Sequence, residues 1–340
     1  MVVKSIYYKG KRVVSFCGLN KTYLLRIREF IQPTGNRRIA LRLLMAASAY
    51  PISLVERFFG ARDYFFEEAL EELYRGLNEK PVALFAIWAQ DDSKFRASVY
   101  YYTKERIRFC KIGFSEQDLE DFQNELTISR YLAAYGKWGF YIPSNIDGFF
   151  GRSVSILSFD CLPPRLTIWR GLPVSKRNLL LIQLQSLTGV QITQVNEKDW
   201  WKSIILHFNK KAGRLSEIVK PWLIEINKQP RRVSFAHGDL GSENVFEDCA
   251  GNLYLIDWER ARFDAPYLTD YIGIWLGSFH EAIINADDKW FISAMKELLQ
   301  DNLDIWDVIL ALLYIASLKF RLAEIVIERL SVQSCINFKD

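Results

Sequence analysis

Two short polar segments carry the residue types that phosphate chemistry needs. His237-Gly238-Asp239 follows an apolar run, Asn244 stands five residues after Asp239, and Asp257 follows a second apolar run. The runs 245–246 and 253–256 can pair as a hairpin, which would bring Asn244 and Asp257 to the same end. Asp239 leads into the same loop, so we expect two carboxylates and one amide to converge. Such oxygens suit Mg²⁺ with phosphate, and a separate carboxylate can accept the proton of an attacking hydroxyl.

These segments resemble a known family. His237-Gly238-Asp239 with Asn244, followed by Ile256-Asp257-Trp258-Glu259, is similar to the aminoglycoside phosphotransferase and choline kinase group, which has a protein-kinase-like fold. The resemblance implies that Asp239 is the catalytic base and that Asn244 and Asp257 bind Mg²⁺. The alternative is a buried polar loop without a catalytic role.

The segment upstream supplies two further residues of that pattern. A kinase-like small lobe needs a lysine on its third strand and a glutamate on the next helix. Lys111 lies in the third predicted strand, 106–114, and Glu125 lies near the apolar face of the following helix. A carboxylate there is costly unless it is paired, so we expect Lys111 to pair with Glu125 and to contact the phosphates. The alternative is a surface lysine and a helix-edge glutamate; Lys104 and Glu120 are the nearest competitors.

The resemblance covers about residues 81–275 and also shows departures. The turn 90–94 has no glycine, whereas protein kinases cover their phosphates with a Gly-rich loop. Ser93 and Lys94 are the residues of this turn that we expect to contact phosphate. Residues 157–162 correspond to the hinge, whose backbone would bind adenine.

Strand patterns come first in the chain and helix patterns later. Ser115 and Asp118 have the spacing of a capping box, so a helix is predicted to begin there. This order predicts an α+β chain, and the resemblance implies a bilobal protein-kinase-like fold. The predicted divisions are an accessory α/β segment 1–80, an N-lobe 81–159 and a C-lobe 160–340. Predicted strands are 82–89, 95–102, 106–114 and 153–159, with brief strands between 232 and 256, and predicted helices are 175–189, 197–226 and 270 to the end.

The first 80 residues read as a separate piece. A strand pair is predicted at 5–8 and 12–16, followed by helices at 21–31, 36–48 and 62–76. Residues 1–42 contain ten basic residues and one acidic residue, a net charge of +9. We favour a solvated face on an accessory domain, and the alternative is peripheral contact with an anionic membrane.

Composition excludes several classes of protein. About half of the 340 residues are apolar and the net charge is +4, which excludes intrinsic disorder. The five cysteines are odd in number and form no CxxC pair, which favours reduced thiols in the cytoplasm. The start of the sequence lacks the apolar stretch of a secretory signal. The three histidines form no HxH or HxxxH pair, so a zinc site is not expected.

The sequence indicates less about the site that would bind the phosphate acceptor than about the site that would bind the nucleotide. Residues 270–307 hold eight carboxylates against two lysines. An acidic rim would suit a cationic acceptor, and solvated helix faces are the alternative. Trp275, Trp290 and Trp306 suit stacking on a sugar or caging an ammonium group, or else belong to the core.

From these residues we expect a small-molecule or glycan kinase. It would transfer the γ-phosphoryl group of ATP, with GTP as the alternative donor, to a hydroxyl of a small molecule or sugar. No nucleic-acid partner is expected. The alternative class is a catalytically inactive kinase-like nucleotide-binding or scaffold protein. All five key residues of the resemblance are present, which favours an enzyme: Lys111, Glu125, Asp239, Asn244 and Asp257.

Overall fold

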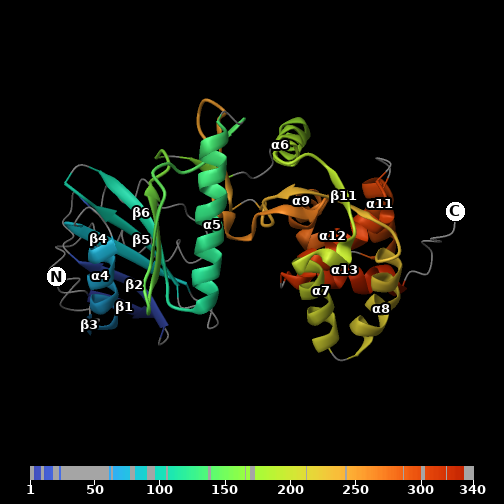
Figure 1. Cartoon of the computed structure of the whole chain (residues 1–340), viewed down its shortest axis with the longest axis horizontal. Coiled ribbons are helices and arrows are strands. Elements are labelled where there is room, and N and C mark those ends of the chain that lie inside the picture. Colours follow the sequence, from blue (N-terminus) through green and yellow to red (C-terminus); the bar gives the residue numbers. More distant parts are fainter. Residues whose placement is uncertain are drawn as a thin grey trace. The chain divides into compact units, whose positions relative to one another are not determined.

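The computed structural model groups the chain into two compact units. The first comprises Met1–Arg170 and Glu243–Glu259, and the second comprises Gly171–Ser242 and Arg260–Asp340. The α+β fold class predicted from the sequence is confirmed (Figure 1). The structure describes residues 4–8, 11–17, 23, 61–62, 64–76, 81–89, 96–104, 106–136, 139–164, 166–168, 173–211, 213–241, 243–285, 287–299, 303–318 and 320–332.

Eight described strands of the first unit form one sheet in the order β3-β1-β2-β4-β5-β6-β9-β8. Strands β4, β5 and β6 are the predicted antiparallel meander, with Ser98 opposite Lys111 in the register. Strand β8 was not predicted; its Gly148 has no side chain to reveal an apolar alternation. The strands are β1 (Lys4–Tyr8), β2 (Lys11–Cys17), β3 (Ala61–Arg62), β4 (Ala83–Trp88), β5 (Arg96–Tyr102), β6 (Ile107–Gly113), β8 (Asp147–Phe150) and β9 (Ser155–Asp160).

Two helices cover this sheet on opposite faces. Helix α4 (Tyr64–Gly76) buries Phe66 and Leu70 in a cluster with one set of sheet residues. Helix α5 (Glu116–Tyr135) buries Phe122 and Leu126 in a second cluster with the alternate residues. Side chains alternate across a strand, and each face of the sheet is covered by one of these helices, so every residue of β4 is buried. Lys111, two residues after the cluster residue Phe109, therefore faces the α5 side.

The described part of the predicted accessory segment 1–80 is continuous with this sheet. Strand β2 pairs with β4 from Val14 to Cys17, and α4 covers one face. A hairpin and one amphipathic helix cannot bury their apolar faces alone, which explains why these elements join the next strands. The predicted helices 21–31 and 36–48 lie outside the described residues, apart from Tyr23.

A smaller sheet of the first unit holds the predicted hairpin. Strands β13 (Val245–Glu247) and β14 (Leu253–Leu255) pair antiparallel, which confirms it. Strand β10 (Thr167–Ile168) joins one edge of the hairpin, and β7 (Phe140–Tyr141) pairs parallel with the other.

The second unit is mainly helical around one apolar helix. Residues 307–316 of α12 (Ile305–Ser317) are all buried. One predicted helix, 197–226, is divided in the structure, because Gly213 has φ +105° between its two parts. The other helices are α6 (Val174–Ser186), α7 (Asp199–Lys210), α8 (Arg214–Ile226), α9 (Thr269–Ser278), α10 (His280–Asn285), α11 (Asp288–Leu299) and α13 (Arg321–Val332).

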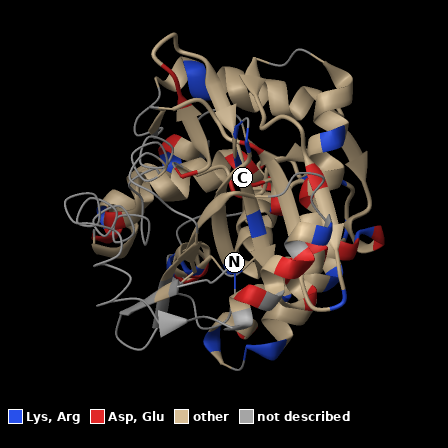
Figure 2. Cartoon of the chain, turned by 90° about the vertical axis from the view of Figure 1, so that its left-hand side faces the viewer, with Lys and Arg blue, Asp and Glu red and all other residues tan. Residues whose placement is uncertain are grey.

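A three-stranded sheet completes the second unit. Its order is β11-β12-β15, from β11 (Gln191–Thr193), β12 (Arg231–Ala236) and β15 (Arg262–Pro266). Lys and Arg are interspersed with Asp and Glu over the described elements (Figure 2). None of the described helices is both long and apolar enough to cross a membrane.

Candidate functional site

The hairpin of the first unit places Asn244 and Asp257 at one end of a pair of strands. Val245 is opposite Leu255, and the Ile256 amide donates to the Asn244 carbonyl at 3.1 Å. Asn244 is 9% exposed. Asp257 has φ +68°, a left-handed conformation that non-glycine residues rarely adopt. Such a conformation persists only where its surroundings enforce it, and it is frequent at functional sites.

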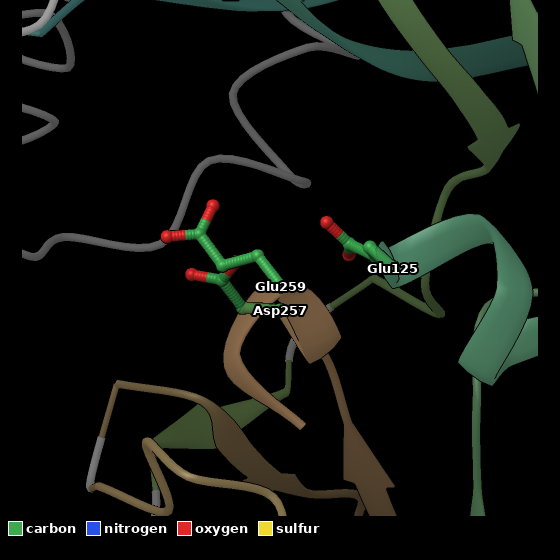
Figure 3. Close-up of side chains that lie close together, drawn as sticks. All are labelled: Glu125, Asp257 and Glu259. Atoms are coloured by element: carbon green, nitrogen blue, oxygen red, sulfur yellow. The ribbon is translucent and has the colours of Figure 1, made fainter. Parts of the chain in front are cut away.

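Lys111 joins two carboxylates that are far apart in the sequence. Its Nζ lies 2.6 Å from Glu125 Oε2 and 2.6 Å from Asp257 Oδ1. The Lys111–Glu125 pair expected from the sequence is thus present. Figure 3 shows Glu125 on α5 with its carboxylate turned toward Asp257 and Glu259. Acceptor atoms of these three carboxylates lie within 4.8 Å of one another.

Burial and charge act in opposite directions on these groups. Burial disfavours the charged form of Lys111, but the carboxylates of Asp257 and Glu125 outweigh it and hold its pKa above the ordinary value. Burial raises the pKa of Glu125 to about 7, and the nearby Asp257 adds to this while Lys111 opposes it. Lys111 therefore stays cationic between these carboxylates.

Arg96, at the start of β5, forms a second cationic centre. Its Nη1 lies 2.6 Å from Glu259 Oε2, and its Nε and Nη2 pair with Asp118 and Asp121. Asp118 is also the expected capping-box partner of the N-cap residue Ser115. Its carboxylate accepts from the Ser115 amide at 2.9 Å, and its own amide donates to Ser115 Oγ at 3.1 Å. Arg96 thus connects the start of α5 to the segment that carries Asp257.

Arg96, Lys111, Asn244, Asp257 and Glu259 line one pocket of about 430 Å³, whose lining residues all belong to the first unit. Apolar residues of the sheet line one part of the pocket, and residues 161–163, which follow β9, line another part. The polar residues of its lining include Arg96, Lys111, Asn244 and Asp257. Carboxylate and amide oxygens beside a lysine fit Mg²⁺ with a phosphate chain, because Mg²⁺ prefers a few protein oxygens together with phosphate oxygens.

The His237-Gly238-Asp239 loop belongs to the second unit, and the buried Asp270 carboxylate holds it in place. Asp270 Oδ2 accepts from the His237 amide at 2.7 Å, and Oδ1 accepts from the Gly238 amide at 2.9 Å. Burial raises the pKa of Asp270 to about 6, although these two hydrogen bonds oppose the shift. Gly238 has φ +78°, and a Cβ there would lie 2.4 Å from the Arg260 carbonyl oxygen. The loop therefore requires glycine at this position.

Asp239 follows with a partly exposed carboxylate. Its Oδ2 lies 3.5 Å from Arg260 Nη1, and its side chain is 29% exposed. The Arg260 guanidinium in turn lies over the ring of Phe320, 4.9 Å from its centroid. Arg260 can therefore orient Asp239 while leaving it open to a ligand.

Comparison with known proteins identifies the fold. No protein-family model matches the sequence, and no curated protein matches it. Solved structures do match. A thermostable mutant of aminoglycoside phosphotransferase APH(4)-Ia is 14% identical, with a TM-score of 0.50 over 78% of this chain and 99% of that one. The chain has a kinase-like phosphotransferase fold.

Two further solved structures match with lower TM-scores. Aminoglycoside-3'-phosphotransferase of type VIII is 17% identical, with a TM-score of 0.45 over 75% of this chain and 99% of that one. Choline kinase LicA from Streptococcus pneumoniae is 12% identical, with a TM-score of 0.44 over 78% of this chain and 96% of that one.

Within this phosphotransferase fold, the predicted residues fall into three groups. The first unit brings together Lys111, Glu125, Asn244 and Asp257. Asp239 lies in the second unit, and its convergence with the first group stays a prediction. Ser93 and Lys94 lie outside the described residues.

Some residues of the site were missed or misread from the sequence. For Asp270, one of the eight carboxylates in residues 270–307, the sequence leaves open an acidic rim or a solvated helix face. The side chain is instead 6% exposed and holds the loop, because two backbone amides direct it inward. Arg96 and Glu259 were not selected, since they are 163 positions apart in the sequence. Trp275, Trp290 and Trp306 all pack against the core of the second unit.

Proposed function

We propose that the protein is a phosphotransferase that moves the γ-phosphoryl group of a nucleoside triphosphate, ATP or GTP, to a hydroxyl of a small molecule or sugar. The observation that carries the proposal is the Lys111 bridge between Glu125 and Asp257 in a pocket that Asn244 also lines. Phosphoryl transfer depends mainly on positioning and on electrostatic stabilisation, which this arrangement provides.

The pocket of the first unit would hold the nucleotide. Apolar residues of β4 and β5 would contact the base, and backbone groups of 161–163 would form its hydrogen bonds. Glu125 and Asp257 fix the Lys111 ammonium group, which would reach the α- and β-phosphates. Because the lysine is held before binding, little conformational entropy is lost when the phosphates arrive.

Asn244 and Asp257 would hold Mg²⁺. Bound there, the ion would neutralise charge on the phosphates. The left-handed backbone of Asp257 directs its carboxylate to the pocket while the hairpin carries Asn244 beside it.

Asp239 would orient the acceptor hydroxyl and take its proton. The hydroxyl oxygen forms a bond to the γ-phosphorus, and the bond to the β–γ bridging oxygen breaks. The nucleoside diphosphate leaves with that electron pair, and the hydroxyl proton passes to the Asp239 carboxylate. Asp270 and Gly238 hold the loop that presents this carboxylate.

Two measurements test the proposal. Mg²⁺ with ATP or GTP should raise the melting temperature, because a ligand that binds only the native state stabilises it. Acceptor-dependent ADP release should then appear in a screen of sugars, aminoglycosides and amino alcohols. Asp257→Ala should lose most of the thermal shift, whereas the matched Asp264→Ala, a similarly exposed carboxylate on β15, should keep it.

The outcomes separate the proposal from its main alternative. Nucleotide binding without transfer to any acceptor of the screen would favour an inactive nucleotide-binding or scaffold protein. No thermal shift with millimolar Mg²⁺ and either nucleotide would contradict any kinase assignment.

A further inference from the structure

The Arg96 guanidinium contacts three carboxylates and one aromatic ring. It pairs with three carboxylates, Asp118, Asp121 and Glu259, and lies over the Phe122 ring at 5.2 Å from its centroid. The arginine side chain is only 14% exposed. A planar fork with five N–H donors can satisfy several carboxylates at once, which an ammonium group cannot do in the same geometry.

Arg96 connects two functional elements. Two of its carboxylates belong to the first turns of α5, the helix that carries Glu125. The third, Glu259, follows Asp257 by two residues. A second contact runs in parallel, because Asn124 Nδ2 donates to the Glu259 carbonyl at 2.9 Å. The start of α5 is thus fastened to the segment that carries Asp257.

Arg96 also sets the charge beside the candidate metal ligands. Acceptor atoms of Glu259, Glu125 and Asp257 form the group within 4.8 Å. Among the described residues around the pocket, Arg96 and Lys111 are the cations that pair with this group. Arg96 neutralises Glu259 and directs its Oε2 toward the guanidinium.

We propose that Arg96 is a positioning residue that keeps Glu259 neutralised beside the metal ligands and thereby links binding of metal and nucleotide to the start of α5. This inference rests on the proposed function. Arg96 thereby limits the affinity of the site for Mg²⁺, because its charge offsets the negative charge that Glu259 would otherwise add beside the metal ligands.

The electrostatic part predicts a change whose sign a merely structural residue would not give. Arg96→Gln leaves the Glu259 charge uncompensated, so the Mg²⁺ concentration that half-saturates the thermal shift at fixed ADP should fall about tenfold at pH 8. Arg96→Lys keeps the charge and should stay within about twofold of the wild type. The double variant Arg96→Gln, Glu259→Gln removes the excess charge, so its midpoint should return to the wild-type value.

The positioning role of Arg96 is measured in the protein without metal or nucleotide. In the metal-free protein, amide hydrogen exchange over residues 116–121 should be faster in Arg96→Gln and in Arg96→Lys, because neither side chain reproduces the fork. Arg106→Gln is the matched control. Arg106, directly before β6, pairs with Asp160 of β9 at 3.1 Å but is 40% exposed, so neither readout should change.

The results separate the two proposals. A wild type that shows no shift with Mg²⁺ and ADP contradicts the proposed function, and unchanged exchange in both Arg96 variants then contradicts the inference as well. A wild type that binds, together with an Arg96→Gln midpoint that is unchanged or raised, overturns the inference alone. If Arg96→Gln does not fold, Arg96→Lys and the double variant decide: slow exchange like that of the wild type in both overturns the inference.

Discussion

Asp270→Asn should gain stability relative to the wild type as pH rises from 4 to 7, and it should be less active. In the native state, burial raises the pKa of Asp270 from an ordinary value of 3.8 to about 6, against the two amide hydrogen bonds. The folded protein therefore holds this proton more tightly than the unfolded chain does. Between about pH 4 and 6 the contribution of Asp270 to stability falls as pH rises, and above that it is constant.

The magnitude follows from the shift. Each pKa unit corresponds to about 1.4 kcal/mol, so ionised Asp270 costs about 3 kcal/mol of folding stability above pH 7. Asparagine matches the protonated acid in shape and cannot ionise. Near pH 4, Asp270→Asn should be less stable than the wild type by about 1–3 kcal/mol, because one buried loop amide loses its acceptor. The stability of the variant relative to the wild type should then rise by about 3 kcal/mol between pH 4 and pH 7, because only the wild type ionises at this position. Activity should fall because the amide oxygen accepts from only one of the two loop amides.

Denaturant unfolding followed by tryptophan fluorescence at pH 5, 6 and 7.5 measures the difference. Asp264→Asn is the control; Asp264 is 32% exposed and pairs with Lys198 at 3.3 Å, so its loss should change stability by less than about 1 kcal/mol. A stability difference between Asp270→Asn and the wild type that does not change with pH would refute the reasoning.

Three other outcomes are expected. Lys111→Met should lower stability by about 3–5 kcal/mol, since it leaves buried Glu125 without its cation, whereas Lys202→Met, in an exposed pair, should cost less than about 1 kcal/mol by the same unfolding assay. Gly238→Ala should abolish transfer in the kinetic assay, because its Cβ would meet the Arg260 carbonyl at 2.4 Å. If the basic segment 1–42 contacts membranes, co-sedimentation with liposomes should require anionic lipid and should weaken with salt; equal binding to neutral liposomes would contradict that role.

Local patterns predicted one half of the site well. The third strand with Lys111, the capped helix with Glu125 and the hairpin between Asn244 and Asp257 all depend on short-range periodicity and turn residues. Once these elements form, the pairing of Lys111 follows from the cost of burying a lone carboxylate.

Long-range contacts explain what was not predicted. Arg96 and Glu259 meet only when β5 and the segment after β14 lie side by side. Asp270 precedes an apolar helical pattern, so its sequence context does not show that it turns back to two loop amides. The sequence of residues 1–80 likewise does not show that α4 covers a sheet whose other strands, such as β4 and β5, come after residue 80 in the chain.

Steady-state transfer by Asp239→Asn tests the central claim most directly, once an acceptor is known. The substitution keeps the size of the side chain but removes the carboxylate that would accept the hydroxyl proton. A positioned base contributes about 10²- to 10⁴-fold, so kcat should fall within that range while Mg²⁺-dependent nucleotide binding, measured by thermal shift, stays near the wild-type value. Asp264→Asn should retain wild-type turnover. A folded Asp239→Asn that binds nucleotide and transfers phosphate at the wild-type rate would contradict the account.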